Sequence, residues 1–185
     1  PEMKFSRTKA KEKMILYVGR FAWEKDPKIL IEAMALVTQK QPDWILQMAG
    51  SGPLLQPMKA LVKAKGLESN VIFLGNVANV ESLYQSASIF VLPSVVEGFP
   101  NALIEAMSAG LPSICFSDIP YEDIVKNNIN AFVLQQRKPE ILADKITALI
   151  DNKTLREDIG SKALEVKHTF AAERIADEYL KFMKL

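Results

Sequence analysis

Lys13-Met-Ile-Leu-Tyr-Val18 is the stretch that decides the fold, and it stops at Gly19-Arg20. A short run that is apolar on both faces and ends at a glycine is typical of a strand buried in a sheet. The next segment, 27–39, has apolar residues at helical spacing and begins with Pro27, which suits the first turn of a helix. The folded part of the chain therefore begins with a strand, a loop and a helix.

The same unit recurs along the chain. Further strands are predicted at 43–49, 71–74, 88–92, 113–116 and 131–134, and further helices at 54–65, 80–86 and 100–109. Short strands that are mostly apolar on both faces and alternate with helices indicate a parallel sheet covered on both sides. The predicted class is α/β, with a doubly wound parallel sheet of about six strands and helices on both faces.

Only helices are predicted after the sheet, at 139–151, 154–168 and 171–183. We expect a single domain over 1–185, with the sheet core at about 13–135 and C-terminal helices at about 139–185, because one hydrophobic core serves a chain of this length. The last helix has an apolar stripe that faces either the core or a neighbouring domain. The stripe consists of Ile175, Tyr179, Phe182 and Met183.

Composition and charge exclude several classes of protein. Of the 185 residues, 49% are hydrophobic and 24% are charged, which excludes a disordered chain. Lys and Arg number 23 against 22 Asp and Glu, so no broad basic field is present to recruit nucleic acid. No apolar stretch reaches the roughly 20 residues of a membrane-spanning helix. We expect a cytoplasmic domain in which Cys115 is a small core residue rather than a reactive thiol.

The loops that follow the strands carry the candidate site, because ligands of open parallel sheets bind beyond the carboxyl ends of the strands. The first of them, Gly19-Arg-Phe-Ala-Trp-Glu-Lys25, contains two cations, and Gly19 lets the backbone approach a ligand closely. Arg20 offers a planar fork and Lys25 a compact charge, a pair that suits a diphosphate. The alternative is an ordinary surface salt bridge to Glu24 or Asp26.

A second candidate set follows the fourth strand, in Pro93-Ser-Val-Val-Glu97-Gly-Phe-Pro-Asn-Ala-Leu-Ile-Glu105-Ala-Met-Ser-Ala-Gly110. We expect Pro100 to be the first residue of a helix that Gly110 ends. The free N–H groups of Asn101 to Leu103 would then point at an anion, with the positive end of the helix dipole behind them.

Two acids flank this helix start: Glu97 in the loop, and Glu105 about five residues inside the helix, roughly 7 Å along its axis. Carboxylates accept hydrogen bonds from sugar hydroxyls, so two of them at this separation can hold two sugars of one ligand. The alternative makes Glu97 a solvated loop acid and Glu105 an ordinary residue of the helix surface.

In this order and spacing, the loops resemble the C-terminal domain of family 4 retaining glycosyltransferases, which have two facing Rossmann-like domains. The markers are Gly19 to Lys25, Ala49-Gly-Ser-Gly-Pro53, Val71-Ile-Phe-Leu-Gly75 and the Glu-x7-Glu stretch from Glu97 to Glu105. The resemblance spans nearly the whole chain. It implies the C-terminal half of a two-domain B-type glycosyltransferase fold, whose N-terminal acceptor domain is absent from this chain.

The resemblance also implies a role for each candidate residue. Arg20 and Lys25 would hold the donor diphosphate, Glu97 would contact the transferred sugar, and Glu105 would bind the ribose of the nucleotide. Arg20, Lys25 and Glu97 form the catalytic set that it implies. Further donor contacts, mostly through backbone groups, would come from Gly19, Val77 near the base, Phe99, Pro100, Asn101, Ala102 and Leu103.

Three positions depart from the family's usual pattern. Pro100 and Asp26 stand where glycine is frequent, and Pro100 removes one N–H group, which would shift the donor contacts to Asn101 and its successors. Ser51 stands where an acidic residue is common, which leaves the role of the Gly50-Ser51-Gly52 loop open.

The implied activity is transfer of a sugar, with retention, from a UDP- or GDP-sugar to a glycan or lipid-linked acceptor in polysaccharide or envelope biosynthesis. UDP is the preferred nucleotide, and no metal, other cofactor or nucleic acid is implied. This chain alone would bind the donor but transfer no sugar, and the full-length protein could associate peripherally with the inner face of the membrane. The alternatives are a nucleotide-sugar 2-epimerase-like enzyme and a catalytically inactive nucleotide-sugar-binding or scaffold module.

Overall fold

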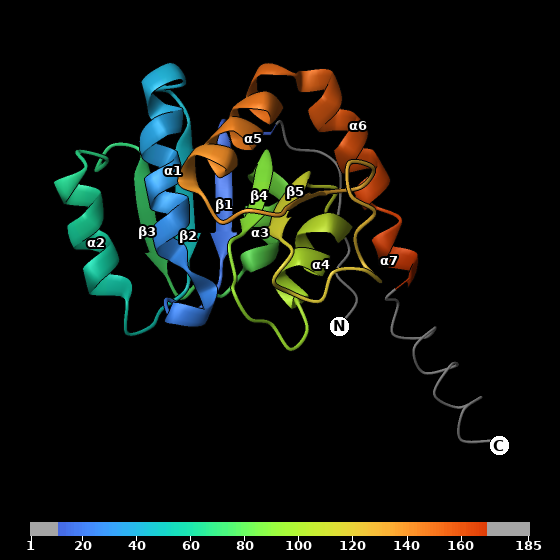
Figure 1. Cartoon of the computed structure of the whole chain (residues 1–185), viewed down its shortest axis with the longest axis horizontal. Helices are drawn as coiled ribbons and strands as arrows, with labels where there is room; N and C mark the ends of the chain where they lie inside the picture. The colour runs from blue at the N-terminus through green and yellow to red at the C-terminus, as the bar shows by residue number, and fades with distance from the viewer. Residues whose placement is uncertain (1–10, 170–185) are drawn as a thin grey trace.

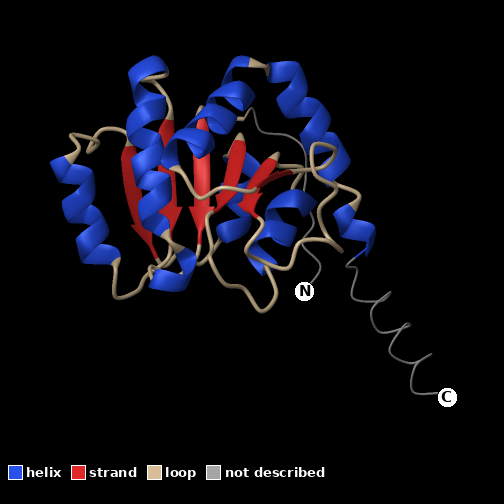
Figure 2. Cartoon of the chain, viewed as in Figure 1, coloured by secondary structure: helices blue, strands red, loops and turns tan. Residues whose placement is uncertain are grey.

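A computed structural model gives the fold of this chain and describes residues 11–169. It contains one six-stranded sheet in the order β3-β2-β1-β4-β5-β6, in which every neighbouring pair is parallel (Figure 2). The strands are β1 (Met14–Val18), β2 (Ile45–Ala49), β3 (Val71–Gly75), β4 (Ile89–Leu92), β5 (Ser113–Phe116) and β6 (Phe132–Leu134). The prediction of a doubly wound parallel sheet is confirmed.

A helix follows each of the strands β1 to β4, β6 comes directly after β5, and three helices follow β6 in the described part of the chain (Figure 1). They are α1 (Pro27–Lys40), α2 (Leu55–Ala64), α3 (Val80–Ser86), α4 (Asn101–Ser108), α5 (Pro139–Asp151), α6 (Lys153–Ala163) and α7 (Val166–Thr169), with one 3-10 turn, η1 (Trp23–Lys25). No helix among these described residues is long and apolar enough to cross a membrane. The last predicted helix, 171–183, with its apolar stripe, lies outside the described residues.

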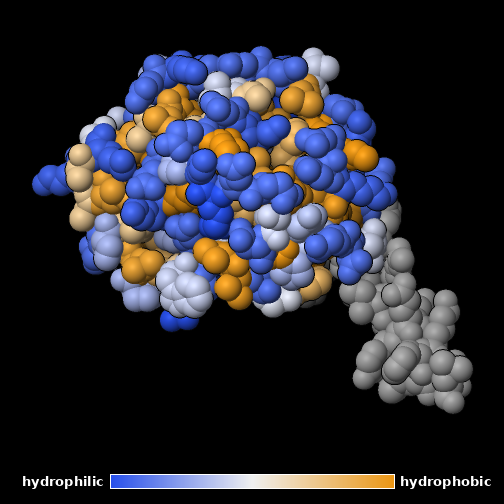
Figure 3. Space-filling model, viewed as in Figure 1, coloured by the Kyte–Doolittle hydropathy of each residue, from blue (hydrophilic) through white to orange (hydrophobic). Residues whose placement is uncertain are grey.

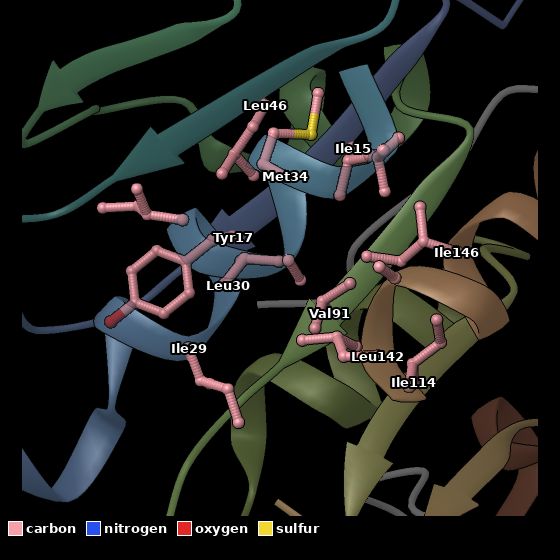
Figure 4. Close-up of a cluster of buried hydrophobic side chains, with 14 of the residues drawn as sticks. Ile15, Tyr17, Ile29, Leu30, Met34, Leu46, Val91, Ile114, Leu142 and Ile146 are labelled. Carbon is pink, nitrogen blue, oxygen red and sulfur yellow. The ribbon is translucent and has the colours of Figure 1, made fainter. Parts of the chain in front are cut away.

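Each face of the sheet has its own hydrophobic cluster, because successive side chains of a strand point to opposite faces. In β1, Ile15 and Tyr17 pack among residues of α1, α2 and α5, while Met14 and Leu16 pack among residues of α3 and α4. Figure 4 shows part of the first cluster, where Leu30 and Met34 of α1 meet side chains of β1 and β2. On the outside, polar residues cover much of the face seen in Figure 3, with apolar ones scattered among them.

The strand order fixes where a ligand site is expected. After β1 the chain adds strands on one side, and from β4 onward on the other, so β1 and β4 lie side by side at the point where the order reverses. The carboxyl ends of the strands point to the same edge, at the bottom of Figure 2. The loops 19–26 and 93–100 leave that edge from adjacent strands, which is where ligands of doubly wound sheets bind.

Two helix boundaries differ from the prediction. The helix predicted at 154–168 is two helices, α6 and α7, because the chain turns at Leu164 and Glu165. Pro100 is not the first helical residue: its φ of −82° and ψ of 65° are not helical, and α4 begins one residue later, at Asn101. A proline fixes only its own φ, so it suits the position before a helix as well as the first turn.

Candidate functional site

The loop after β1 is held in place by the loop after β2. The N–H group of Gly19 donates to the carbonyl of Ala49 (3.0 Å), and that of Phe21 donates to the carbonyl of Ser51 (2.9 Å). The N–H group of Leu54 in turn donates to the carbonyl of Phe21 (2.8 Å). These bonds satisfy backbone groups that regular structure leaves unpaired, and they fix the course of the loop that carries Arg20.

The glycines of the second loop are required by this contact. A Cβ atom on Gly50, whose φ is +133°, would lie 2.0 Å from the carbonyl oxygen of Gly19. A Cβ atom on Gly52, whose φ is +154°, would lie 2.5 Å from the carbonyl oxygen of Phe21. The Gly50-Ser51-Gly52 segment, whose role the sequence left open, therefore supports the first loop through its backbone.

Lys25 and Glu97 meet directly, although they are 72 positions apart in the chain. Lys25 Nζ lies 2.6 Å from Glu97 Oε1, and the two side chains are only 22% and 8% exposed. The hydroxyl of Ser94 donates to the same oxygen at 2.7 Å. The partner of Lys25 is thus neither Glu24 nor Asp26, and Glu97 is not a solvated loop acid. Two candidates from different loops form one enclosed pair.

Arg20 belongs to the same loop as Lys25, but unlike Lys25 it is exposed. Among the described residues its guanidinium makes no ion pair or hydrogen bond, and its carbonyl accepts a hydrogen bond from the hydroxyl of Tyr17 (2.8 Å). Burial, with a smaller effect of the Glu97 charge, raises the pKa of Tyr17 well above its ordinary value, so this hydroxyl keeps its proton. The backbone of Arg20 is therefore fixed while its side chain stays available to a ligand.

Glu105 is positioned by a residue that sequence reasoning missed. The hydroxyl of Tyr84, on α3, donates to Glu105 Oε2 at 2.9 Å. Burial, and then the adjacent Glu105 charge, raises the pKa of Tyr84, so the hydroxyl stays a donor. A buried tyrosine needs a hydrogen-bond partner, which is the one signal that the sequence offered, but only the fold identifies that partner.

The sequence predicts free N–H groups at the start of α4, but two of them have backbone partners. That of Asn101 donates to the carbonyl of Phe99 (2.9 Å), and that of Leu103 donates to the carbonyl of Pro100 (3.0 Å). The tight turn at Pro100 brings these carbonyls within reach of the helix start. The side chain of Leu103 is fully buried, so only its backbone could face a ligand, whereas Phe99 is half exposed. Between them, Ala102 is partly buried.

The loop after β3 begins next to the loop after β2. The N–H group of Gly50 donates to the carbonyl of Gly75 at 2.7 Å, which joins the second loop to the third. Val77 follows two residues later and is partly buried. The structure thus brings Val77 to the same edge of the sheet, and its predicted place near a base stays a prediction.

Arg137 is a second residue that sequence reasoning missed. It follows β6, at the edge of the sheet, yet its guanidinium lies 2.8 Å from Asp26 Oδ2 and 3.0 Å from Asp118 Oδ2. It also donates to the carbonyls of Pro93 and Ser94. Nothing near Arg137 in the sequence indicates these contacts, because they depend on how three loops meet.

The described residues contain no group of three or more His, Cys, Asp or Glu side chains that could hold a metal ion. The free thiol of Cys115 is buried in the second cluster, and burial raises its pKa to about 12. The prediction that Cys115 is a core residue is confirmed.

Comparisons with known proteins agree with this architecture. An uncharacterised glycosyltransferase of Haemophilus influenzae is 33% identical over 172 residues, which cover 92% of this chain and 49% of that protein. A GalNAc-GalNAc-diNAcBac-PP-undecaprenol alpha-1,4-N-acetyl-D-galactosaminyltransferase of Campylobacter jejuni is 29% identical over 187 residues, which cover 98% of this chain and 51% of that protein. The chain thus spans about half the length of these curated relatives.

Solved structures share the fold. A mutant TarM of S. aureus, in complex with fondaparinux, alpha-GlcNAc-glycerol and UDP, superimposes with a TM-score of 0.87 at 27% identity, over 97% of this chain and 37% of TarM. The C-terminal domain of a group 1 glycosyl transferase from Francisella tularensis gives a TM-score of 0.76 at 27% identity, over 85% of this chain and 84% of that domain.

The family match does not favour the epimerase alternative. Residues 1–166 match the family model described as glycosyl transferases group 1, which covers most of the sequence. The fold is accordingly that of the C-terminal domain of B-type glycosyltransferases. This chain belongs to the group 1 glycosyl transferases.

Proposed function

We propose that this chain is the donor-binding domain of a retaining glycosyltransferase and that it binds a nucleotide-diphosphate sugar. The observation that carries the proposal is the enclosed contact between Lys25 and Glu97 at the edge of the sheet where the strand order reverses. In a nucleotide-diphosphate sugar, the sugar is bonded directly to a phosphate. A cation that can bind the phosphate and a carboxylate that can accept hydrogen bonds from the sugar therefore need to lie close together, as Lys25 and Glu97 do. UDP is the preferred nucleotide, and the UDP bound to TarM supports this choice.

Each of the two cations has a distinct part in this proposal. Arg20, exposed and without a protein partner among the described residues, offers its planar fork to the diphosphate. Lys25, already held by Glu97, is placed between the sugar and the phosphate next to it. As the sugar leaves, negative charge develops on the nucleoside diphosphate, and cations fixed in advance stabilise it without reorganising.

Glu105 binds the ribose in this proposal. Tyr84 already donates to its Oε2 atom, which fixes the carboxylate and leaves Oε1 to accept hydrogen bonds from ribose hydroxyls. Glu97 uses Oε1 for Lys25 and Ser94, so its Oε2 atom is the one that faces the transferred sugar.

The acceptor would be bound by another domain of the full-length protein, and transfer with retention requires both. A glycan or lipid-linked acceptor of the cell envelope is supported by the names of two relatives: the undecaprenol-linked glycan of the Campylobacter jejuni enzyme, and poly(ribitol-phosphate) for an enzyme of Staphylococcus aureus that is 28% identical over 172 residues. A cytoplasmic location, at the inner face of the membrane, belongs to the same proposal.

Calorimetric titration with UDP and GDP tests the donor site. We expect one nucleotide per chain to bind, and Glu105→Ala to weaken its binding at least about tenfold, because hydrogen bonds to a charged group contribute about 1.5–3 kcal/mol. Glu157→Ala is the matched control, since Glu157 is an exposed acid of α6 that pairs with Lys153. Absence of nucleotide binding would favour the scaffold alternative. Transfer from a UDP- or GDP-sugar by this chain alone would refute the division of labour between domains.

A further inference from the structure

Arg137 joins the loops that carry the candidate site. Its side chain is 22% exposed and leaves the end of β6, passing over the ring of Phe116 with 4.3 Å between its Cζ atom and the ring centroid. From there its two terminal nitrogens reach the loop after β4 and the start of α1. An arginine can do this because its guanidinium is flat, always charged and carries several donors in a fixed fork.

The contacts of Arg137 close a ring around the Lys25–Glu97 pair. On one side, Nη2 pairs with Asp26, the residue directly after Lys25. On the other side, Nη1 donates to the carbonyl of Ser94, whose hydroxyl donates to Glu97. The ring is completed by the side chain of Lys25, which bonds to Glu97, and by the side chain of Ser94. Arg137 thus adds a further tie between the two loops, which the pair and the hydrogen bond from the N–H group of Val95 to the carbonyl of Glu24 (2.8 Å) also join.

The tie to Arg137 acts on Asp26, whose backbone is in an unfavourable conformation. Asp26 has a φ of +39°, in the left-handed region that non-glycine residues rarely adopt, and its carboxylate accepts from the N–H group of Ile29 at the start of α1. The pairing with Arg137 binds the other carboxylate oxygen and offsets part of the strain at this residue. Lys25 is the last residue of η1 and is joined directly to this turn, because Asp26 is the C-cap of η1.

We propose that Arg137 is a positioning residue of the donor site, which sets the Lys25–Glu97 pair for the diphosphate and the sugar. This role rests on the proposed function. Arg137 acts on the phosphate and sugar side of the site, whereas Glu105 is held separately by Tyr84. Loss of Arg137 therefore weakens binding of a nucleoside diphosphate more than binding of the corresponding monophosphate.

Arg156 is a matched control, because it makes similar contacts away from the site. It donates to the carbonyls of Leu149 and Ile150 at the end of α5, and its guanidinium lies 5.8 Å from the ring centroid of Trp44. If Arg137 only stabilises the fold, Arg137→Ala and Arg156→Ala should both lower the melting temperature. Both variants should then keep the wild-type preference for UDP over UMP.

The test is calorimetry with UDP and UMP on the wild type, Arg137→Ala, Arg137→Lys and Arg156→Ala, below the melting temperature of each. We expect Arg137→Ala to lower the preference for UDP over UMP about tenfold, a loss of about 1.4 kcal/mol. Arg137→Lys should recover part of it, because one ammonium can pair with Asp26 but cannot also hold both carbonyls. Arg156→Ala should keep the wild-type preference.

A preference in Arg137→Ala within about twofold of the wild type would overturn the proposal, whatever stability is lost. If Arg137→Ala does not fold, Arg137→Lys decides in its place: a drop of about threefold or more supports the role, and a smaller one overturns it. A wild-type chain that binds neither UDP nor GDP would overturn the proposed function itself, and this role with it.

Discussion

The Lys25–Glu97 pair is the contact at the centre of the proposed donor site. Both side chains are largely enclosed, and a second donor, Ser94, reaches the same carboxylate oxygen. An enclosed pair of this kind is costly to break on one side only, because the remaining charge loses its partner away from water. A ligand phosphate that approaches Lys25 adds a second anion to a cation already held in place.

Replacement of Lys25 by alanine should weaken binding of UDP about tenfold, because a charge-assisted contact to phosphate is lost. Lys28→Ala is the control: Lys28 lies three positions further, on α1, and pairs with Glu32 on an exposed surface. Calorimetric titration of both variants measures the difference. Equal affinities for UDP would mean that Lys25 does not contact the ligand.

Replacement of Tyr84 by phenylalanine should lower the free energy of unfolding by about 1 kcal/mol, because a buried hydrogen bond to Glu105 is lost. The same change should weaken binding of UDP several-fold, since the carboxylate loses the donor that fixes it. Tyr121→Phe, at the edge of the same hydrophobic cluster, is the control. Denaturant unfolding and UDP titration report the two effects, and unchanged UDP binding would separate Tyr84 from the site.

Loops are the elements that build the site, and the loop after β1 is supported by backbone hydrogen bonds to the glycine-containing loop after β2. The location of these loops could be predicted, because each follows a short apolar strand and parallel strands end at one edge. The contacts of these loops could not be predicted, because the partners are far apart in the sequence. Lys25 bonds to Glu97 across more than 70 positions, and Arg137 bonds to Asp26 across more than 100. The turn at Pro100 likewise escaped prediction, because proline restricts its own φ but leaves its ψ open.

Replacement of Gly50 by alanine should disturb the first loop and destabilise the chain by about 3 kcal/mol, since overpacking adds to the cost of an unfavourable φ. Gly66→Ala separates these terms, because Gly66 also has a positive φ, +66°, but an added Cβ would meet nothing within 4 Å. We expect about 1 kcal/mol for that control. Denaturant unfolding measures the free energy of unfolding that each variant loses. Equal losses in the two variants would mean that the contact of Gly50 with the first loop adds nothing.

At the scale of the whole molecule, the fold class followed from the alternation of apolar strands and helices, because that pattern has few stable solutions. The strand order did not follow from it. That order places β1 beside β4 and so brings Lys25 and Glu97, from strands separated in sequence by two others, to one place. The turn at Leu164 was missed because helical periodicity continues through it.

Stability at alkaline pH is a property of the whole molecule, since buried acids on both faces of the sheet have raised pKa values. Cys115, Tyr17 and Tyr84 each bind their proton more tightly in the folded chain than in the unfolded one. Their contribution is complete below the unfolded pKa and is lost as the pH rises above it.

We therefore expect the free energy of unfolding to fall from about pH 9, where an unfolded thiol ionises, and more steeply above about pH 10, where unfolded tyrosines do. Each group adds a slope of up to about 1.4 kcal/mol per pH unit. Urea unfolding at a series of pH values measures the slope, and Tyr84→Phe should reduce it above pH 10. A stability that stays level up to pH 11 would be inconsistent with these buried groups.

An NMR titration of the isotope-labelled chain with UDP is the sharpest test of a donor site at the carboxyl edge of the sheet, because it shows both whether the nucleotide binds and where. We predict that amide shifts concentrate at the carboxyl edge of the sheet, in the segments 19–25, 75–77 and 97–105. Shifts that spare these segments, or no shifts with either UDP or GDP, would contradict a donor site at this edge.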